Sequence, residues 1–178
     1  MSKDQQAAAG TAEGQGPVEI DAELARQLEN KREDLFEKFE IPEGFPDAVM
    51  DEAEAITTDV GSEIEAELGD RADLREMTTW TTDPIDAQDF DDAISIEERD
   101  DEYVLWVHIA DVTHYVSPDT EMWAEAIRRG NTVYLPAHTV HMLPAVLAET
   151  VCSLVPEEDR LAHTVEMHLD KETLSYDD

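Results

Sequence analysis

Five aspartates lie close together between Asp83 and Asp92, in the stretch DPIDAQDFDD. From Met77 to Ile96 no glutamate occurs, although glutamate outnumbers aspartate in the whole chain. Short carboxylates on one loop can converge on a point, as a divalent cation requires. Magnesium prefers such oxygen ligands and is often held by carboxylates together with a substrate phosphate. Two ions about 4 Å apart can activate a water and stabilise the leaving oxygen of a phosphodiester. The segment is therefore compatible with metal-assisted phosphodiester hydrolysis.

The spacing alone leaves other interpretations of this loop open. A solvated acidic loop, or a turn capped by short side chains such as Asp86, would have the same composition. A calcium loop is excluded, because no glycine follows Asp89 and Asp91 at the required position and no glutamate closes the loop. We do not expect a second metal site at His138 and His141, since the chain between them is predicted to be loop without a partner.

In the segments around the aspartates, apolar side chains either alternate with polar ones or form short continuous runs. Both patterns predict β-strands. A helix is expected from Asp119 or Thr120, either of which could cap it, to Gly130. A short buried helix is expected at 144–154, and a turn at 170–173 with a new strand from Leu174. The predicted strands are 78–82, 93–96, 103–110, 132–136 and 162–169.

The first 69 residues differ from the rest in composition and in the spacing of apolar residues. Residues 1–16 are small and polar without an apolar period, which predicts a flexible N-terminus. Residues 17–69 are predicted to be a helical segment, with amphipathic helices at 17–40 and 47–68 separated by a Pro- and Gly-containing break. Residues 70–178 form the predicted second domain. The fold class expected is α+β or mixed α/β, with N-terminal helices followed by a mixed β-sheet.

The composition is strongly acidic. Asp and Glu outnumber Lys and Arg by 45 to 12, giving a net charge of −33. With only four lysines and a normal apolar share, this is typical of a salt-adapted, haloarchaeal-like proteome; a very acidic mesophilic protein is the alternative. No apolar run is long enough to span a membrane, and no signal pattern is present. Cys152 is the only cysteine, so it has no disulfide partner in the chain. A soluble, cytoplasmic protein is expected.

A series of short blocks in one order resembles the RNB catalytic domain of the ribonuclease II / ribonuclease R exoribonuclease family. The resemblance extends roughly from Asp70 to Asp170 without a large gap. The blocks are Asp73-Leu74-Arg75, Thr82-Asp83-Pro84, Asp89-Phe90-Asp91-Asp92-Ala93, Val107-His108-Ile109-Ala110-Asp111-Val112, Tyr115-Val116, Arg129-Gly130, Val133-Tyr134-Leu135-Pro136, Met142-Leu143-Pro144, Cys152-Ser153-Leu154 and Arg160-Leu161-Ala162.

The resemblance implies roles for five residues. Asp83, Asp89, Asp91 and Asp92 match the family's magnesium-site aspartates, with Asp91 the most critical for catalysis. Two Mg²⁺ ions would be held there, and Mn²⁺ is possible. Tyr134 matches the aromatic residue that stacks near the 3′ end of RNA, and base–aromatic stacking contributes about 1–3 kcal/mol per base.

The implied reaction is processive 3′→5′ hydrolysis of single-stranded RNA to nucleoside 5′-monophosphates, by a monomer. The family's catalytic domain continues beyond position 178 and carries a catalytic arginine there. The resemblance therefore implies the front part of an RNB-type domain, truncated at its C-terminus. A non-catalytic RNA-binding or regulatory fragment of the same family is the alternative.

The remaining polar candidates are expected to be structural. His108 and Asp111 are predicted to be hydrogen-bonded groups at a buried strand end, and Cys152 a small core residue. Arg128 and Arg129 would complement the dipole of the helix that they end, with phosphate contact as the alternative.

Overall fold

The computed structural model describes residues 22–85, 87–135 and 138–176. The expected flexible N-terminus, Asp86 and Pro136 lie outside these residues. The chain divides into two compact units, Met1–Ile41 and Pro42–Asp178, which are considered separately.

The first unit contains helix α1 (Ala22–Phe39). Ion pairs one turn apart lie along it, for example between Glu23 and Arg26 at 2.7 Å. The helix ends where Glu40 adopts a left-handed φ of 51°. The amide of Ile41 then donates to the carbonyl of Phe36 at 3.0 Å, which closes a Schellman-type end.

The second unit begins with helix α2 (Asp47–Glu67), which follows Pro46 and confirms the second expected helix. Its buried stripe includes Val49 and Ala53, and it contacts helix α4 and the π-helix η1. The other helices of this unit are α4 (Glu121–Arg129) and η1 (Leu147–Val151), of which η1 is shorter than the helix expected at 144–154. A one-turn helix, α3 (Val112–Tyr115), was not expected from the sequence.

Helix α4 has the ends that the sequence predicted. Of the two expected caps it is Thr120 that acts, since its hydroxyl accepts a hydrogen bond from the amide of Trp123 at 3.1 Å. Gly130 follows the helix with a φ of 76°, a conformation that side chains with a Cβ rarely adopt. Glu52 of α2 accepts from the amide of Met122 at 2.8 Å, so it links the two helices at this end.

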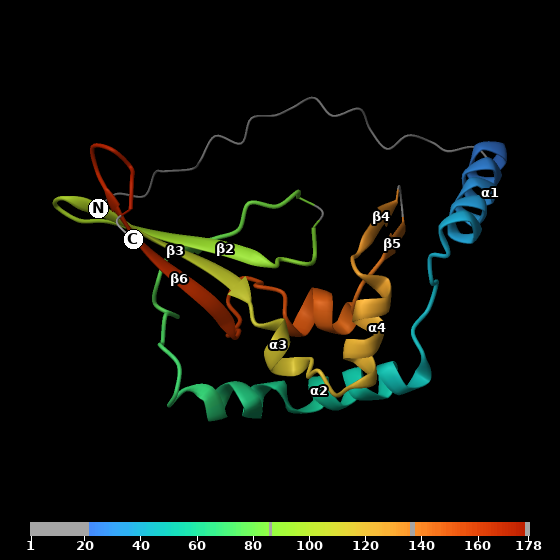
Figure 1. The fold of residues 1–178 in the computed structure, drawn as a ribbon, viewed down its shortest axis with the longest axis horizontal. Helices are drawn as coiled ribbons and strands as arrows, with labels where there is room; N and C mark the ends of the chain where they lie inside the picture. The colour runs from blue at the N-terminus through green and yellow to red at the C-terminus, as the bar shows by residue number, and fades with distance from the viewer. Residues whose placement is uncertain (1–21, 86, 136–137, 177–178) are drawn as a thin grey trace, which may run out of the picture. The chain divides into compact units, whose positions relative to one another are not determined.

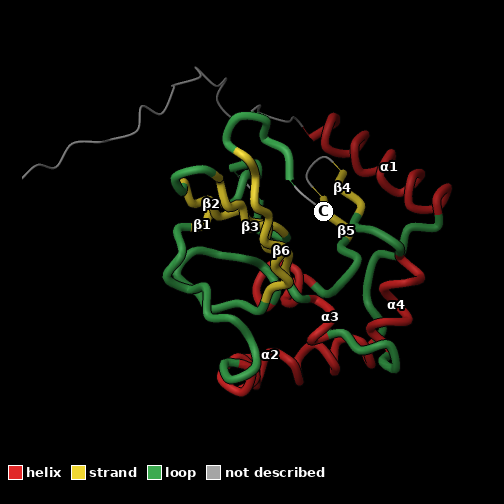
Figure 2. Tube along the Cα trace, turned by 60° about the vertical axis from the view of Figure 1, so that its left-hand side comes forward, coloured by secondary structure: helices red, strands yellow, loops and turns green. Residues whose placement is uncertain are grey.

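A four-stranded sheet forms the other part of the second unit, in the order β1-β2-β3-β6. Figure 1 shows β2, β3 and β6 side by side, and Figure 2 labels all four strands. Its strands are β1 (Thr79–Trp80), β2 (Asp92–Glu98), β3 (Glu102–Ala110) and β6 (Ala162–Asp170). All three pairings are antiparallel. The α+β class is confirmed, and the expected mixed sheet is corrected to an antiparallel one. The near-continuous apolar run of β3 arises because both faces of this strand are apolar.

A separate hairpin is formed by β4 (Val133–Leu135) and β5 (His138–Val140), beside α4 (Figure 2). The expected loop between His138 and His141 is therefore wrong, since most of it is strand β5. The expected strand at Leu174 is also wrong, because the described residues from Leu174 to Tyr176 contain no strand. Asp170 instead closes a tight turn by accepting hydrogen bonds from the amides of Glu172 and Thr173.

On one face of the four-stranded sheet, the part formed by β2 and β3 is buried, whereas most β6 side chains on that face are exposed. The buried part carries Ala93 and Ser95 from β2 and Val104, Trp106 and His108 from β3. Beyond the end of β3, at Ala110, the helices pack into the main core. That core consists of Val49, Ala53, Ala110, Tyr115, Val116, Met122, Leu143, Leu147, Val151, Cys152 and Leu161.

The opposite face of the sheet, which we call the apolar sheet face, is partly open to solvent. Opposite residues in antiparallel strands lie on the same face, and the register places Trp80, Ile94, Val107 and Val165 in one row across the four strands. Trp80 and Val165 are 46% and 57% exposed.

No helix among the described residues is long and apolar enough to cross a membrane.

Candidate active site

The aspartate loop connects β1 to β2 and includes three of the four predicted metal ligands; the fourth, Asp92, is the first residue of β2. The loop lies at the end of β3, because Asp92 pairs with Ile109 and the amide of Ala110 donates to the carbonyl of Asp91 at 2.9 Å. On its other side, the amide of Leu154 donates to the carbonyl of Phe90 at 2.9 Å. Two segments distant in sequence thus hold the loop.

The four aspartates act on one another electrostatically. The pKa of Asp91 is raised above its ordinary value, first by desolvation from surrounding protein atoms and then by the negative charges of Asp89, Asp92 and Asp83. The Asp91 side chain nevertheless remains open to solvent, so this desolvation is partial. The charges of Asp83, Asp89 and Asp92 therefore act on Asp91, which lies within electrostatic range of all three.

Strand β4 brings Tyr134 to the same place. Its hydroxyl donates a short hydrogen bond to Oδ2 of Asp89, and this bond, partial burial and the charges of Asp89 and Asp91 raise the pKa of the phenol to about 12. The ring remains 65% exposed. An exposed aromatic ring next to the aspartates is compatible with base stacking.

The donor chemistry of this loop fits a hard divalent cation. In the described ranges, no ion pair joins Asp83, Asp89, Asp91 or Asp92 to an arginine or lysine. The carboxylates are not gathered tightly, because within these same ranges no group of three His, Cys, Asp or Glu side chains is close enough to hold a metal ion. The structure thus has the required ligand types in an open arrangement.

His108 and Asp111 have the structural roles expected of them. Buried His108 hydrogen-bonds Ser95 at 3.0 Å and Thr164 at 2.9 Å, and burial lowers its pKa. Asp111, which is 3% exposed, pairs with Arg71 at 2.8 Å and with His163 at 3.0 Å. Neither side chain forms a described hydrogen bond or ion pair with the aspartate loop. Both therefore stabilise the fold around the loop.

The basic residues at the end of α4 are occupied by internal contacts. Glu125 accepts from both Arg128 and Arg129, at 2.6 and 2.7 Å. The Arg129 side chain is 3% exposed and lies 3.7 Å from the centroid of the Phe45 ring, so phosphate contact by this residue is excluded in this conformation. His141 also has a partner that the sequence did not indicate, Glu149 at 2.9 Å.

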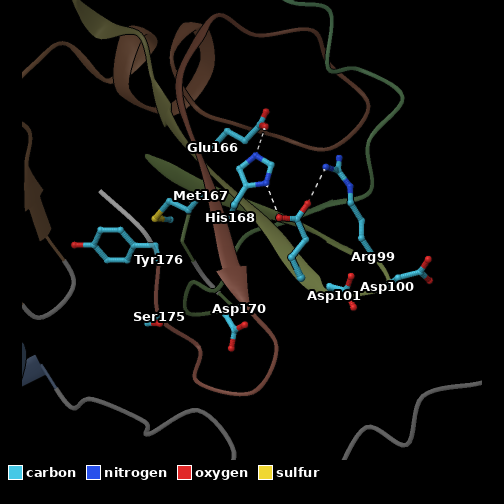
Figure 3. A pocket seen from close by; sticks show the side chains of 10 residues that line it. Arg99, Asp100, Asp101, Glu166, Met167, His168, Asp170, Ser175 and Tyr176 are labelled. Carbon is cyan, nitrogen blue, oxygen red and sulfur yellow. Dashed lines mark hydrogen bonds and ion pairs between the residues drawn. The ribbon is translucent and has the colours of Figure 1, made fainter.

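A cleft of about 770 Å³ lies at the other end of β2 and β3 (Figure 3). In it His168 is held between Glu102 and Glu166, each at 2.9 Å, and these hydrogen bonds raise its pKa. The cleft was not predicted from the sequence, because its residues come from a turn and a strand 60 residues apart. Its lining residues are Arg99, Asp100, Asp101, Glu102, Glu166, Met167, His168, Asp170, Ser175 and Tyr176.

The sequence of this chain is similar to those of known proteins. The family model for the RNB domain matches residues 71–177. Ribonuclease R of Aquifex aeolicus is 46% identical over 138 residues, which are 77% of this chain and 19% of that protein. Ribonuclease R of Chlamydia trachomatis is 43% identical over 136 residues, with 76% and 19% covered. The chain thus spans about a fifth of the length of the curated relatives it matches.

A solved structure shares the fold as well. RNase R of Mycoplasma genitalium, in complex with ribose-methylated single-stranded RNA, superposes with a TM-score of 0.72 at 30% identity. The match covers 80% of this chain and 22% of that one.

Proposed function

The chain belongs to the RNB domain family, and on this premise we propose that it carries the metal-binding part of a 3′→5′ exoribonuclease. The proposed substrate is single-stranded RNA, and the products are nucleoside 5′-monophosphates. The observation that carries the proposal is the hydrogen bond from Tyr134 to Asp89, in a segment whose four metal-site carboxylates pair with no described arginine or lysine. Ribonuclease R relatives and the RNA complex of the Mycoplasma genitalium enzyme support it.

Asp83, Asp89, Asp91 and Asp92 would hold two Mg²⁺ ions, or Mn²⁺ in their place. When bound, the ions supply an activated water and offset the charge on the scissile phosphate and the leaving 3′ oxygen. The raised pKa of Asp91 reflects desolvation first and, after it, repulsion from the carboxylates of Asp89, Asp92 and Asp83. A divalent cation would relieve that repulsion and draw the open arrangement together.

The protein's own residues would orient the RNA end. The exposed Tyr134 ring can stack on a base without demanding a sequence. Its hydroxyl fixes the ring beside Asp89, so a stacked base would lie next to the carboxylates. Tyr134 would therefore position the scissile phosphate relative to the aspartates.

The proposal extends to cellular setting and assembly. We propose a cytoplasmic monomer adapted to high salt, in which acidity at the loop recruits RNA through cations and acidity elsewhere maintains hydration. The support is the net charge of −33 with four lysines. Screening in molar salt shortens the Debye length to about 3 Å, which removes long-range repulsion between the protein and RNA.

The test is Asp91→Asn in a full-length context that supplies the rest of an RNB catalytic domain, assayed with 3′-single-stranded RNA and Mg²⁺ in molar KCl. We expect the wild-type protein to release 5′-mononucleotides and the variant to lose at least about 100-fold in rate, because a neutral amide ligates Mg²⁺ poorly. Asp100→Asn is the matched control, since it makes the same charge change in the turn between β2 and β3 and should leave the rate unchanged.

Equal rates for Asp91→Asn and the wild type would contradict the proposed site. RNA binding without any nucleotide release by the wild-type protein in that full-length context would instead favour the alternative, a non-catalytic RNA-binding member of the family.

A further inference from the structure

Ser153 is completely buried and uses its hydroxyl on the aspartate loop alone. Its Oγ accepts a hydrogen bond from the amide of Phe90 at 3.0 Å and donates one to the carbonyl of Gln88 at 2.8 Å. These two backbone groups lie directly before and after Asp89. One side chain therefore brackets a single residue of the loop, from 63 to 65 positions away in the sequence.

Ser153 is itself held in place from two directions. The next residue, Leu154, donates its amide to the carbonyl of Phe90 at 2.9 Å, which adds a third bond between the two segments. The guanidinium of Arg160 donates to the carbonyl of Ser153 at 3.0 Å, and this arginine side chain is 13% exposed. The serine is thus a fixed point to which the loop is attached.

The loop needs such an attachment because the negative charges of its aspartates repel one another. Asp83, Asp89, Asp91 and Asp92 carry like charges, and no described arginine or lysine pairs with them. Repulsion favours a loop that spreads, whereas a cation site needs the carboxylates kept near one another. Backbone bonds on both sides of Asp89 resist that spreading without occupying its carboxylate.

We propose that Ser153 is a positioning residue, which fixes the backbone on both sides of Asp89 so that its carboxylate faces a divalent cation shared with the other aspartates. This inference rests on the proposed function for the identity of the site, but its geometric part does not. Groups that orient metal ligands typically contribute about 10- to 100-fold to metal affinity.

The test compares the Mn²⁺ affinity of Ser153→Ala with that of the wild type. Mn²⁺ is titrated into each protein in 2 M KCl, and electron paramagnetic resonance measures the free ion. Hydrogen exchange of the Phe90 amide is measured by NMR on the metal-free proteins. We expect the Mn²⁺ dissociation constant to rise about 10- to 100-fold, and the Phe90 amide to exchange faster than global unfolding allows. Ser153→Cys, which keeps a polar atom of similar size but bonds weakly, should show the same direction with a smaller change, and it replaces Ser153→Ala if that variant does not fold.

Ser95→Ala is the matched control. Ser95 is also a buried serine, 1% exposed, but it bonds Thr79 and His108 within the sheet. Its replacement should lower stability and leave Mn²⁺ affinity within twofold of the wild type. A purely structural role for Ser153 would make the two variants behave alike.

The outcomes separate the two proposals. A folded Ser153→Ala protein with wild-type Mn²⁺ affinity and a protected Phe90 amide would overturn the role of Ser153. Equal Mn²⁺ affinity in the wild type and in Asp91→Asn would overturn the metal site, and the Phe90 exchange rates would then still decide whether Ser153 holds the loop.

Discussion

Two histidines of the sheet have neighbours that shift the pKa of the imidazole in opposite directions. His108 is enclosed between Ser95 and Thr164, where burial disfavours the charged imidazole. His168 is exposed between Glu102 and Glu166, whose carboxylates favour it. The difference arises from the positions of the two strands, since His108 lies in β3 between β2 and β6, whereas His168 lies in β6 at the end of the strand order.

We predict opposite titrations for these two histidines. The pKa of His108 lies below the usual 6.5 and that of His168 lies above it. ¹⁵N chemical shifts of the imidazoles, followed from pH 5 to 8, measure both in one sample. For His108 the contribution to stability is complete above pH 6.5 and is lost as the pH falls towards its lower folded-state pKa, since the unfolded chain takes up the proton first. A His108 that titrates above His168 would contradict this assignment.

At the scale of elements, β3 organises the molecule. It pairs with β2 and β6, its last residue Ala110 holds the carbonyl of Asp91, and the turn before it lines the cleft. The helices α2, α4 and η1 pack beyond its end. This strand therefore attaches one side of the aspartate loop to the core, and the segment around Ser153 attaches the other.

Helix ends and interiors give a matched pair of glycine substitutions. Gly130 ends α4 with a φ of 76°, and Gly61 lies inside α2; an added Cβ would meet nothing within 4 Å at either position. Gly130→Ala should therefore lower the free energy of unfolding by about 1 kcal/mol through backbone strain alone. Gly61→Ala should raise it by up to about 1 kcal/mol, because alanine favours helix.

Urea denaturation of both glycine variants beside the wild type measures the two effects. If both substitutions were to shift stability in the same direction, the left-handed end of α4 or the helical state at Gly61 would be wrong.

Local chemistry was predictable from the sequence, and long-range pairing was not. Thr120 and Gly130 could be recognised because capping depends on residues within one helical turn. The loop of aspartates was recognisable because its members are neighbours in the chain. The hydrogen bonds of Ser153 to the aspartate loop join segments 63 to 65 residues apart, and nothing in the sequence indicates that these segments meet. The partner of His141 and strand β5 were missed for another reason, because both depend on near neighbours in a stretch too short to have a clear apolar pattern.

At the scale of the whole molecule, the net charge of −33 opposes compaction. We predict that the midpoint of thermal unfolding rises with KCl. Most of the rise should occur below about 1 M, because the Debye length falls from about 10 Å at 0.1 M to about 3 Å at 1 M. Differential scanning calorimetry at KCl concentrations from 0.1 to 2 M measures it. A midpoint that is constant or falls over this range would argue against salt adaptation and for an acidic protein stable in dilute buffer.

The apolar sheet face adds a second consequence of salt. Trp80, Ile96, Ile109 and Val165 are each about half exposed on it, and in dilute buffer the like charge of every molecule keeps two such faces apart. Salt that screens this charge stabilises each molecule and at the same time removes the colloidal barrier between molecules. Folding stability and solubility will therefore have different optimal ionic strengths, and the solubility optimum lies at the lower one.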